Sequence, residues 1–470
     1  MSGERRWTPE QRLAIEARGR HLLVSAAAGS GKTSVLVRRV IERLLDPQRP
    51  VDVDRMLVVT FTEAAAAEMR DRIRQALEEE IERRPADMRL RRQLGLLSRA
   101  AISTLHSFCM QVIRQYHYRI DLDPAFRVLE EHEALLLRQD VLDDVLEERH
   151  AAGGEAFRAL LEGYGGRDEE ALRGFILELY DLAAAQPWPD AWLDGLVARF
   201  DEAARRPLEE SPWMEPLRAL ARREAQVALF HVEEALRLCA LPDGPADRAA
   251  ILETDRERLR EVIATAGAGT WDEIRASLDG AWPRFTGRTD VDRKLLKRVQ
   301  DHRERAKKRL AELRDRVFHS DAAAAAADLA RMRPLAAELV DLVRAFRDAF
   351  AAAKAELGAV DFADMERLAL RVLLDDGAAP GELRPSPAAR ELRERFEEVL
   401  VDEYQDINEV QDAILHLVAR DGADGVPNLF MVGDVKQSIY RFRLAEPSLF
   451  LRKYATFPPL RPGEGGGAGE

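Results

Sequence analysis

The segment Ser25–Thr33, SAAAGSGKT, combines small residues with a lysine and a hydroxyl group. Small residues let consecutive backbone N–H groups converge on an anion. An apolar run precedes the segment and a helical pattern begins at Lys32, so the positive end of a helix dipole adds to the attraction. The pattern predicts a phosphate-binding loop in which Lys32 contacts the terminal phosphates and the Thr33 hydroxyl binds Mg²⁺. The residues of the predicted loop are Ala26, Ala27, Ala28, Gly29, Ser30 and Gly31.

The loop departs from the usual G-x-x-x-x-G-K-[ST] pattern at its first position, where Ala26 replaces glycine. Alanine is small enough for the loop to form. The alternative interpretation is a glycine-rich turn that only caps a helix. The strand pattern before the segment and the helix pattern after it favour the phosphate site.

Two adjacent carboxylates, Asp402 and Glu403, follow the apolar run Val399–Val401. In an open parallel sheet, the carboxyl end of a buried strand lies beside the phosphate loop. We therefore expect Asp402 to hold Mg²⁺ and Glu403 to orient and deprotonate the attacking water. The alternative, two acids that begin a surface turn, leaves the loop without a metal partner.

Three further residues suit a nucleotide. Gln11, in WTPEQ, precedes the loop and has an amide that could recognise an adenine edge. Gln437 and Arg443, in VGDVKQSIYRFR, follow another apolar run and suit contact with the γ-phosphate and with transition-state charge. Each alone could be a surface residue, but together with the loop they predict ATP and Mg²⁺ as cofactors.

The elements that position these residues alternate in type. Apolar runs at 21–26, 55–61 and 100–105 predict strands, and FEEVLVDE and NLFMVGD predict two more. Between them, from about Tyr116 to Leu357, the pattern has the 3.6-residue period of helices. The sequence therefore predicts an α/β protein whose parallel-sheet domain is interrupted by a large all-helical insert. The predicted ranges are 1–118 and 358–458 for the sheet domain, 119–357 for the insert, and 459–470 for a linker or truncated end.

Composition excludes several classes of protein. The chain has 470 residues and a formal net charge of -13, which argues weakly against a general nucleic-acid coat but does not exclude a local groove. Its start is charged and no apolar run approaches membrane-spanning length, so we expect a cytoplasmic protein that does not contact a membrane. Cys109 and Cys239 are too few for a disulfide framework or a thiolate metal cluster, and we expect both to be buried apolar residues.

A basic strip lies within the predicted insert. From Arg284 to Arg309 there are eleven lysine or arginine residues against four acids. This is a candidate phosphate-contacting surface. The alternative is an ordinary solvated helix face.

Six motifs together resemble the UvrD-like superfamily 1 DNA helicases: WTPEQ, AAAGSGKT, VVTFTEAAAAEMRDRI, STLHSF, VDEYQD and VGDVKQSIYRFR. The segment GDVKQSIYRFRLAEP and the long insert are most similar to the AddA-type subunits of helicase-nucleases, with RecB-type subunits as the nearest alternative. The resemblance implies a RecA-like motor domain, movement along single-stranded DNA in the 3′ to 5′ direction, and a role in double-strand break repair and recombination. It also implies an AddB-like partner subunit.

The resemblance implies roles at matching positions. Phe61 and His106 would line the path of single-stranded DNA, and Phe61, Tyr440 and Phe442 would contact or stack on bases. Core packing is the alternative for these aromatic residues. Arg70 would link the nucleotide and DNA sites. A further pair in VDFADM is interpreted as structural, capping a helix: Asp361 and Asp364.

The family's second motor domain, its arginine finger and the AddA nuclease with its iron–sulfur cluster have no counterpart before Glu470. We therefore expect an incomplete motor that binds Mg-ATP weakly and hydrolyses it poorly alone. The competing hypothesis is a nucleotide-binding DNA clamp or assembly scaffold that does not unwind DNA. A plain phosphotransferase would share the loop but has no need of TFTEAAAAEM or QSIYRFR.

Overall fold

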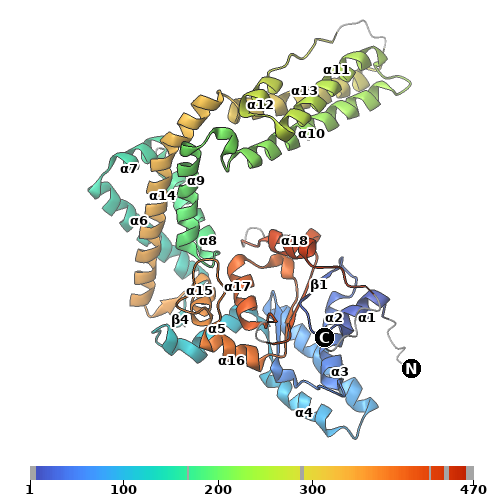
Figure 1. Ribbon diagram of the computed structural model, residues 1–470, viewed down its shortest axis with the longest axis vertical. Coiled ribbons are helices and arrows are strands. Elements are labelled where there is room, and N and C mark those ends of the chain that lie inside the picture. Colours follow the sequence, from blue (N-terminus) through green and yellow to red (C-terminus); the bar gives the residue numbers. More distant parts are fainter. Residues whose placement is uncertain (1–6, 167–168, 286–290, 423–424, 439–443, 462–470) are drawn as a thin grey trace. The chain divides into compact units, whose positions relative to one another are not determined.

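The computed structural model describes residues 7–166, 169–285, 291–422, 425–438 and 444–461 (Figure 1). The chain divides into two compact units. Unit 1 comprises Met1–Ala152, Gly166–Trp192 and Leu342–Glu470, and unit 2 comprises Gly153–Gly165 and Leu193–Asp341. The predicted fold class, an α/β domain with a parallel sheet and a large helical region, is confirmed. The domain boundaries predicted from the sequence remain predictions.

Unit 1 contains a five-stranded sheet in the order β1-β7-β6-β2-β3, and every neighbouring pair is parallel. All five strands predicted from the sequence are present. Their bounds are Leu22–Ser25 for β1, Met56–Thr60 for β2, Ala101–Thr104 for β3, Glu398–Val401 for β6 and Leu429–Gly433 for β7. Segments from both ends of the chain are therefore interleaved in one sheet.

Both faces of the sheet are buried, which explains why the strands are apolar without alternation. Val58 and Leu400 face one hydrophobic core, while Val59 and Val401 face the other. The first core is completed by α1 (Pro9–Glu16), α2 (Lys32–Leu45), α3 (Glu63–Arg83) and α4 (Met88–Leu96). The second is completed by α5 (Leu105–Tyr116), α15 (Phe362–Leu373), α16 (Pro387–Arg395), α17 (Glu409–Val418) and α18 (Pro447–Thr456).

The chain leaves and re-enters the sheet region at a short parallel pairing. Strand β4 (Arg127–Val128) pairs with β5 (Ala359–Val360). The predicted all-helical range is thus wrong at β4, because this two-residue strand carries no hydrophobic period of its own and depends on its distant partner. The helices of unit 1 that follow β4 are α6 (Glu131–Ala152) and α8 (Glu170–Ala184).

The return to the sheet domain is fixed by a capped helix. Asp361 is the N-cap of α15, and its side chain and that of Asp364 form a reciprocal capping box. The buried Lys354 lies 2.8 Å from Asp361 and 2.5 Å from Asp364. The structural, helix-capping role predicted for these two aspartates is confirmed.

Unit 2 has a helical core built from α10 (Met214–Cys239), α11 (Ala249–Ala268), α12 (Trp271–Leu278) and α13 (Arg293–Arg316), which run beside one another in Figure 1. Helix α7 (Glu155–Leu160) also belongs to this unit, and the division between the units falls within α9 (Pro189–Arg205) and α14 (Ala322–Glu356). Alanines of α10 allow close helix packing, since Ala221, Ala225 and Ala228 are fully buried.

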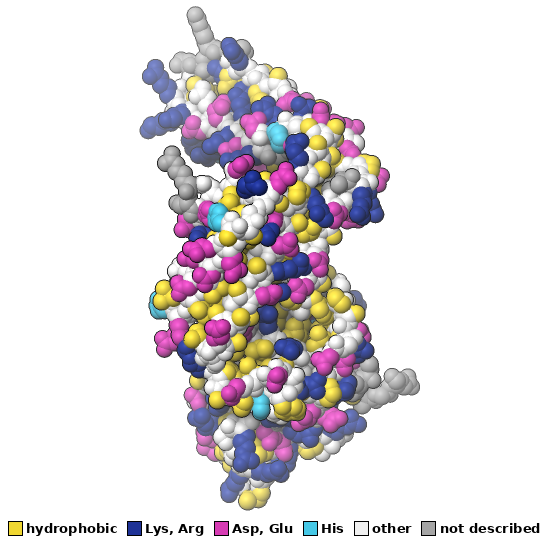
Figure 2. Space-filling model, turned by 90° about the vertical axis from the view of Figure 1, so that its left-hand side faces the viewer, with side chains coloured by type: hydrophobic (Ala, Val, Ile, Leu, Met, Phe, Trp, Pro, Cys, Tyr) yellow, Lys and Arg dark blue, Asp and Glu magenta, His cyan; other side chains and the backbone are white. Residues whose placement is uncertain are grey.

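The environment of the two cysteines and the distribution of charge on the surface agree with what the composition predicts. Cys109 and Cys239 are both free and buried, as predicted. On the face shown in Figure 2, acidic and basic side chains are interspersed over most of the surface. Among the described residues, no helix combines the length and the low polarity that a membrane crossing requires.

Candidate nucleotide and DNA site

The carboxyl edge of the sheet collects the candidate residues in strand order. The predicted phosphate loop follows β1, Gln437 follows β7, and Asp402 and Glu403 follow β6. On the other side of β6, Phe61 follows β2 and His106 lies just past β3. The phosphate loop, Gln437 and the acid pair therefore lie at one half of the edge, and Phe61 and His106 lie at the other half.

The phosphate loop is open and its geometry requires glycine. Gly29 and Gly31 have φ angles of +72° and +89°, which residues with a side chain rarely adopt. Ala27, Ala28, Gly29 and Ser30 are exposed, so their backbone groups are accessible to a ligand. Helix α2 begins at Lys32 without a side-chain cap, which leaves its first N–H groups available to an anion.

Lys32 lies between the two groups that the sequence assigned to ATP hydrolysis. Its Nζ is 3.3 Å from Glu403 Oε2 and donates to Gln437 Oε1 at 3.4 Å. These contacts join residues that are 371 and 405 positions apart in the chain. The predicted convergence of the acids near position 402 with the phosphate loop is confirmed.

Two residues that the sequence analysis missed complete a closed polar ring with Lys32, Glu403 and Gln437. Gln405 donates to Glu403 Oε2 at 2.9 Å and accepts the backbone N–H of Asp434 at 2.9 Å. Asp434 in turn accepts from Gln437 Nε2 at 2.6 Å. Gln405 lies in the motif VDEYQD and Asp434 lies in VGDVKQ. Their roles in the ring become visible only when the fold brings the two motifs together.

Gly433 allows this ring to form. A Cβ at this position would lie 2.3 Å from Gln405 Oε1 and 3.0 Å from Phe450. Only glycine leaves room for the Gln405 amide beside the end of β7.

Asp402 and Thr33 fit the predicted metal. Burial, and then the charge of Glu403, raise the pKa of Asp402 to about 6. A bound cation would stabilise the ionised form of this carboxylate. Carboxylate and hydroxyl oxygens are hard ligands that suit Mg²⁺. Glu403 has a φ of +53°, which turns the chain sharply directly after Asp402.

The structure places Gln11 against the phosphate loop and Arg70 against the edge strand β3. Gln11 forms the capping box of α1 with Thr8, and its Nε2 donates to the Ser30 carbonyl of the phosphate loop at 2.9 Å. Arg70, on α3, donates to the Ile102 carbonyl of β3 at 2.6 Å. Its predicted role as a link between two ligand sites therefore stays a prediction.

The predicted DNA side has two polar contacts that sequence reasoning missed. Glu63 accepts from Thr104 at 2.8 Å and from Ser107 at 2.7 Å, which ties TFTE to STLHSF. These hydrogen bonds lower the pKa of Glu63. His106 is 42% exposed at its side chain and lies 3.0 Å from the carboxylate of Glu366 on α15.

Three predicted residues, Tyr440, Phe442 and Arg443, lie outside the described residues. Their proposed contacts with bases and with the γ-phosphate stay predictions.

The basic strip has two kinds of residue. Arg303 is buried, whereas Lys307 and Arg309 pair with Glu304 and Glu224. Five others on α13 are exposed and have no acidic partner among the residues that the structure describes: Arg293, Lys294, Lys297, Arg298 and Arg305. The strip therefore combines buried and paired residues with a set of exposed cations on one helix.

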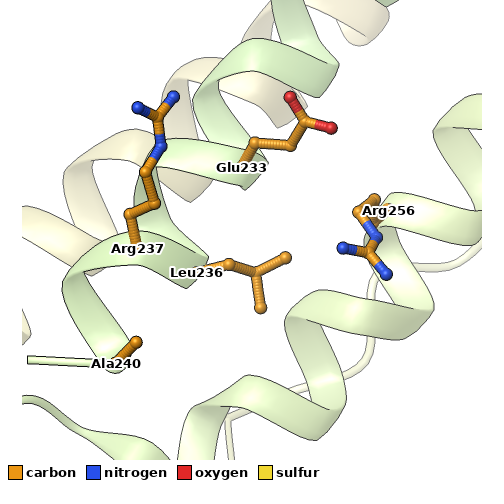
Figure 3. Close-up of a pocket in the computed structure, with 5 residues that line it drawn as sticks. All are labelled: Glu233, Leu236, Arg237, Ala240 and Arg256. Carbon is orange, nitrogen blue, oxygen red and sulfur yellow. The ribbon is translucent and has the colours of Figure 1, made fainter.

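A separate open pocket of about 340 Å³ lies between α10 and α11 in unit 2 (Figure 3). Its two arginines already pair with neighbours on their own helices, Arg237 with Glu234 and Arg256 with Glu253. The pocket contains none of the residues predicted to bind nucleotide. It is lined by Glu233, Leu236, Arg237, Ala240 and Arg256.

A parallel sheet with a phosphate loop after its first strand and an acid pair after a central strand defines a P-loop nucleotide-binding protein. Residues 7–458 match the family model of the UvrD/REP helicase N-terminal domain. The chain belongs to this helicase family, as the motifs predicted.

The chain is similar to several proteins that are each named as the A subunit of an ATP-dependent helicase/nuclease. It is 49% identical to the one from Moorella thermoacetica, with 99% of this chain and 33% of the relative covered. The relative from Pelotomaculum thermopropionicum is 48% identical over 100% of this chain and 37% of its own length. That from Geobacillus kaustophilus is 47% identical, covering 98% and 37%. The chain thus spans about a third of the length of these relatives.

Proposed function

We propose that this chain is the ATP-binding first motor region of a DNA helicase that acts as part of an AddA-like helicase-nuclease subunit. ATP hydrolysis would drive movement along single-stranded DNA in the 3′ to 5′ direction, in double-strand break repair and recombination. The names of the relatives support ATP dependence and a multisubunit assembly, and an AddB-like protein is the partner we propose. A cytoplasmic location follows from this role.

The polar ring suggests how nucleotide binding prepares hydrolysis. Lys32 is held by Glu403 and Gln437 at the long distances of 3.3 and 3.4 Å, so incoming phosphates can take over its ammonium group. Glu403 is then free to accept a proton from the attacking water, while Gln405 keeps the carboxylate in place. Bound at Asp402 and Thr33, Mg²⁺ would neutralise phosphate charge. Arg443 would act beside Gln437 on the γ-phosphate.

The DNA path we propose crosses the other half of the sheet edge. Phe61 and His106 follow the neighbouring strands β2 and β3, whose Thr60 and Thr104 are in register. Base stacking on Phe61, Tyr440 and Phe442 would hold a strand without sequence preference, as a translocating motor requires. The exposed part of the basic strip on α13 offers phosphate contacts to duplex DNA.

The observation that carries the proposal is the 3.3 Å contact between Lys32 and Glu403, which links the phosphate loop with the acid pair. We expect Lys32→Ala to abolish DNA-stimulated ATP turnover in the complete gene product and to leave the circular dichroism spectrum unchanged. Turnover that survives this substitution would contradict the proposal. If wild-type protein binds ATP and DNA without unwinding, the clamp or scaffold function replaces the motor.

A further inference from the structure

Glu366 is a buried carboxylate that neither the nucleotide site nor the DNA site explains. It lies on α15 and its side chain is only 8% exposed. A buried carboxylate is costly unless hydrogen bonds and charges compensate it. Burial opposes its ionisation, but hydrogen bonds from His106, Gln411 and Asn408, together with the charge of His106, outweigh burial and lower the pKa of Glu366. The side chain is therefore a charged hydrogen-bond acceptor inside unit 1.

The three donors come from two segments that are far apart in the chain. His106 belongs to STLHSF at the start of α5, and its Nε2 lies 3.0 Å from Glu366 Oε1. Asn408 and Gln411 begin α17, directly after VDEYQD, and donate to Oε2 at 3.0 Å and to Oε1 at 2.5 Å. Because an ionised carboxylate only accepts, His106 must carry a hydrogen on Nε2.

The amides of Asn408 and Gln411 have no freedom to turn away. Their oxygens accept backbone N–H groups in the capping box of α17, so their NH₂ groups must face Glu366. The carboxylate thus holds the N-terminus of α17 through the same two side chains that cap it.

The network reaches the surface at one end and the acid pair at the other. His106 is partly exposed and its ring lies edge-on to Phe362, which is 53% exposed. At the other end, a short helical turn, Tyr404–Asp406, joins Glu403 to Ile407 and Asn408. A single oxygen, Glu366 Oε1, accepts from both His106 and Gln411, so a displacement of the histidine changes the hydrogen bond at α17.

We propose that Glu366 is a positioning residue that couples occupancy of the DNA path at His106 to the orientation of the acid pair Asp402–Glu403. DNA that engages the exposed edge of His106 competes for its Nε2–H. Glu366 then redistributes its hydrogen bonds toward Asn408 and Gln411, and the turn that carries Glu403 follows. The inference rests on the proposed motor function and adds a route by which DNA stimulates hydrolysis.

The test compares DNA-stimulated with basal ATP turnover in the complete gene product. Glu366→Gln keeps the shape of the side chain but replaces one acceptor with a donor that faces the donors of the network. We expect the stimulation ratio to fall at least tenfold, with the KM for ATP changed less than twofold.

Glu80→Gln is the matched control, because Glu80 is also a buried glutamate of unit 1 and pairs with Arg38 and Arg83 on the far side of the sheet. We expect its stimulation ratio to stay within twofold of wild type even where its unfolding midpoint falls.

A second variant covers the case in which Glu366→Gln does not fold. Asn408→Ser keeps a side chain that caps helices well but removes the amide donor to Glu366. This variant should also lower the stimulation ratio. The ratio is measured at saturating DNA, so that a change in the DNA concentration needed for half-stimulation does not explain the loss. A ratio that stays within twofold of wild type in the folded Glu366→Gln or Asn408→Ser variant overturns the coupling role. A wild-type protein without any DNA stimulation overturns the proposed function instead.

Discussion

Units 1 and 2 each contain an internal ion pair, but the two pairs differ in geometry. Arg303 and Asp255 in unit 2 are almost completely buried, with two hydrogen bonds of 2.5 and 3.1 Å, and the arginine also donates to the Pro283 carbonyl. Lys32 and Glu403 in unit 1 lie 3.3 Å apart, and the Glu403 side chain is 37% exposed. A closed, bidentate pair holds helices together. A longer pair with one open side can exchange its partner for a ligand.

The largest effect should come from removing the carboxylate of the Lys32–Glu403 pair in unit 1. Glu403→Gln removes the proposed general base but preserves the size of the side chain. We expect ATP turnover to fall by roughly 10²- to 10⁴-fold, the range that general acid–base catalysis contributes. Nucleotide affinity should stay within a few-fold of wild type, measured by displacement of a fluorescent ATP analogue.

The control for this variant is Glu397→Gln, one residue before β6, where the glutamate pairs with Arg55 and Arg420. It should leave turnover within twofold of wild type. Equal losses in both variants would assign the effect to the fold rather than to chemistry.

Removing the carboxylate of the Arg303–Asp255 pair in unit 2 should instead lower the stability of that unit. Asp255→Asn leaves Arg303 charged and buried without a carboxylate, which costs about 3 to 5 kcal/mol in comparable buried pairs. Urea unfolding of the 470-residue chain should show an earlier transition for the helical unit. Nucleotide affinity should not change, and a large loss of affinity would contradict the separation of roles between the two pairs.

The same contrast explains what the sequence could predict. Lys32, Thr33, Asp402 and Glu403 stand in contiguous motifs next to apolar runs, so local pattern and parallel-sheet topology together located them. Gln405 and Asp434 stand in the same motifs, but their roles depend on a contact between them that spans 29 residues and two strands. Glu366 lies outside the nucleotide motifs and meets Asn408 and Gln411 from another helix. Strand β4 has two residues and depends on β5 for its existence. Hydrophobic periodicity indicates which face of a single helix or strand is buried. It does not indicate which distant segments pair with each other.

A smaller effect concerns protonation in unit 1. Burial lowers the pKa of His416 to about 4; the carboxylate of Asp412 opposes this shift, whereas Lys453, His21 and Arg393 favour it. His416 is therefore neutral in the folded state, while the unfolded chain takes up a proton near pH 6.5. Stability from this site is present above pH 6.5 and is lost as the pH falls toward 4.

The difference between wild type and His416→Gln measures this loss. Between pH 7.5 and 5 we expect wild type to lose about 2 kcal/mol more in its free energy of unfolding than the variant. Urea titrations at both pH values provide the comparison, and other titrating groups cancel because both proteins share them. Parallel losses would show that His416 titrates normally in the folded state.

The smallest effects should come from substitutions on the surface of α13. There, we expect the presence or absence of an acidic partner to affect DNA binding rather than stability. Lys307 pairs with Glu304 at 2.7 Å, whereas Lys297 is exposed and has no acidic partner in the part of the chain that the structure describes. Substitution of either residue by alanine should change the free energy of unfolding by less than about 0.5 kcal/mol. If the basic strip contacts DNA, Lys297→Ala should also lower the slope of log affinity against log salt by about 0.9. Lys307→Ala should lower it less, because Glu304 already neutralises that charge. Equal slopes for Lys297→Ala and wild type would instead favour a solvated helix face.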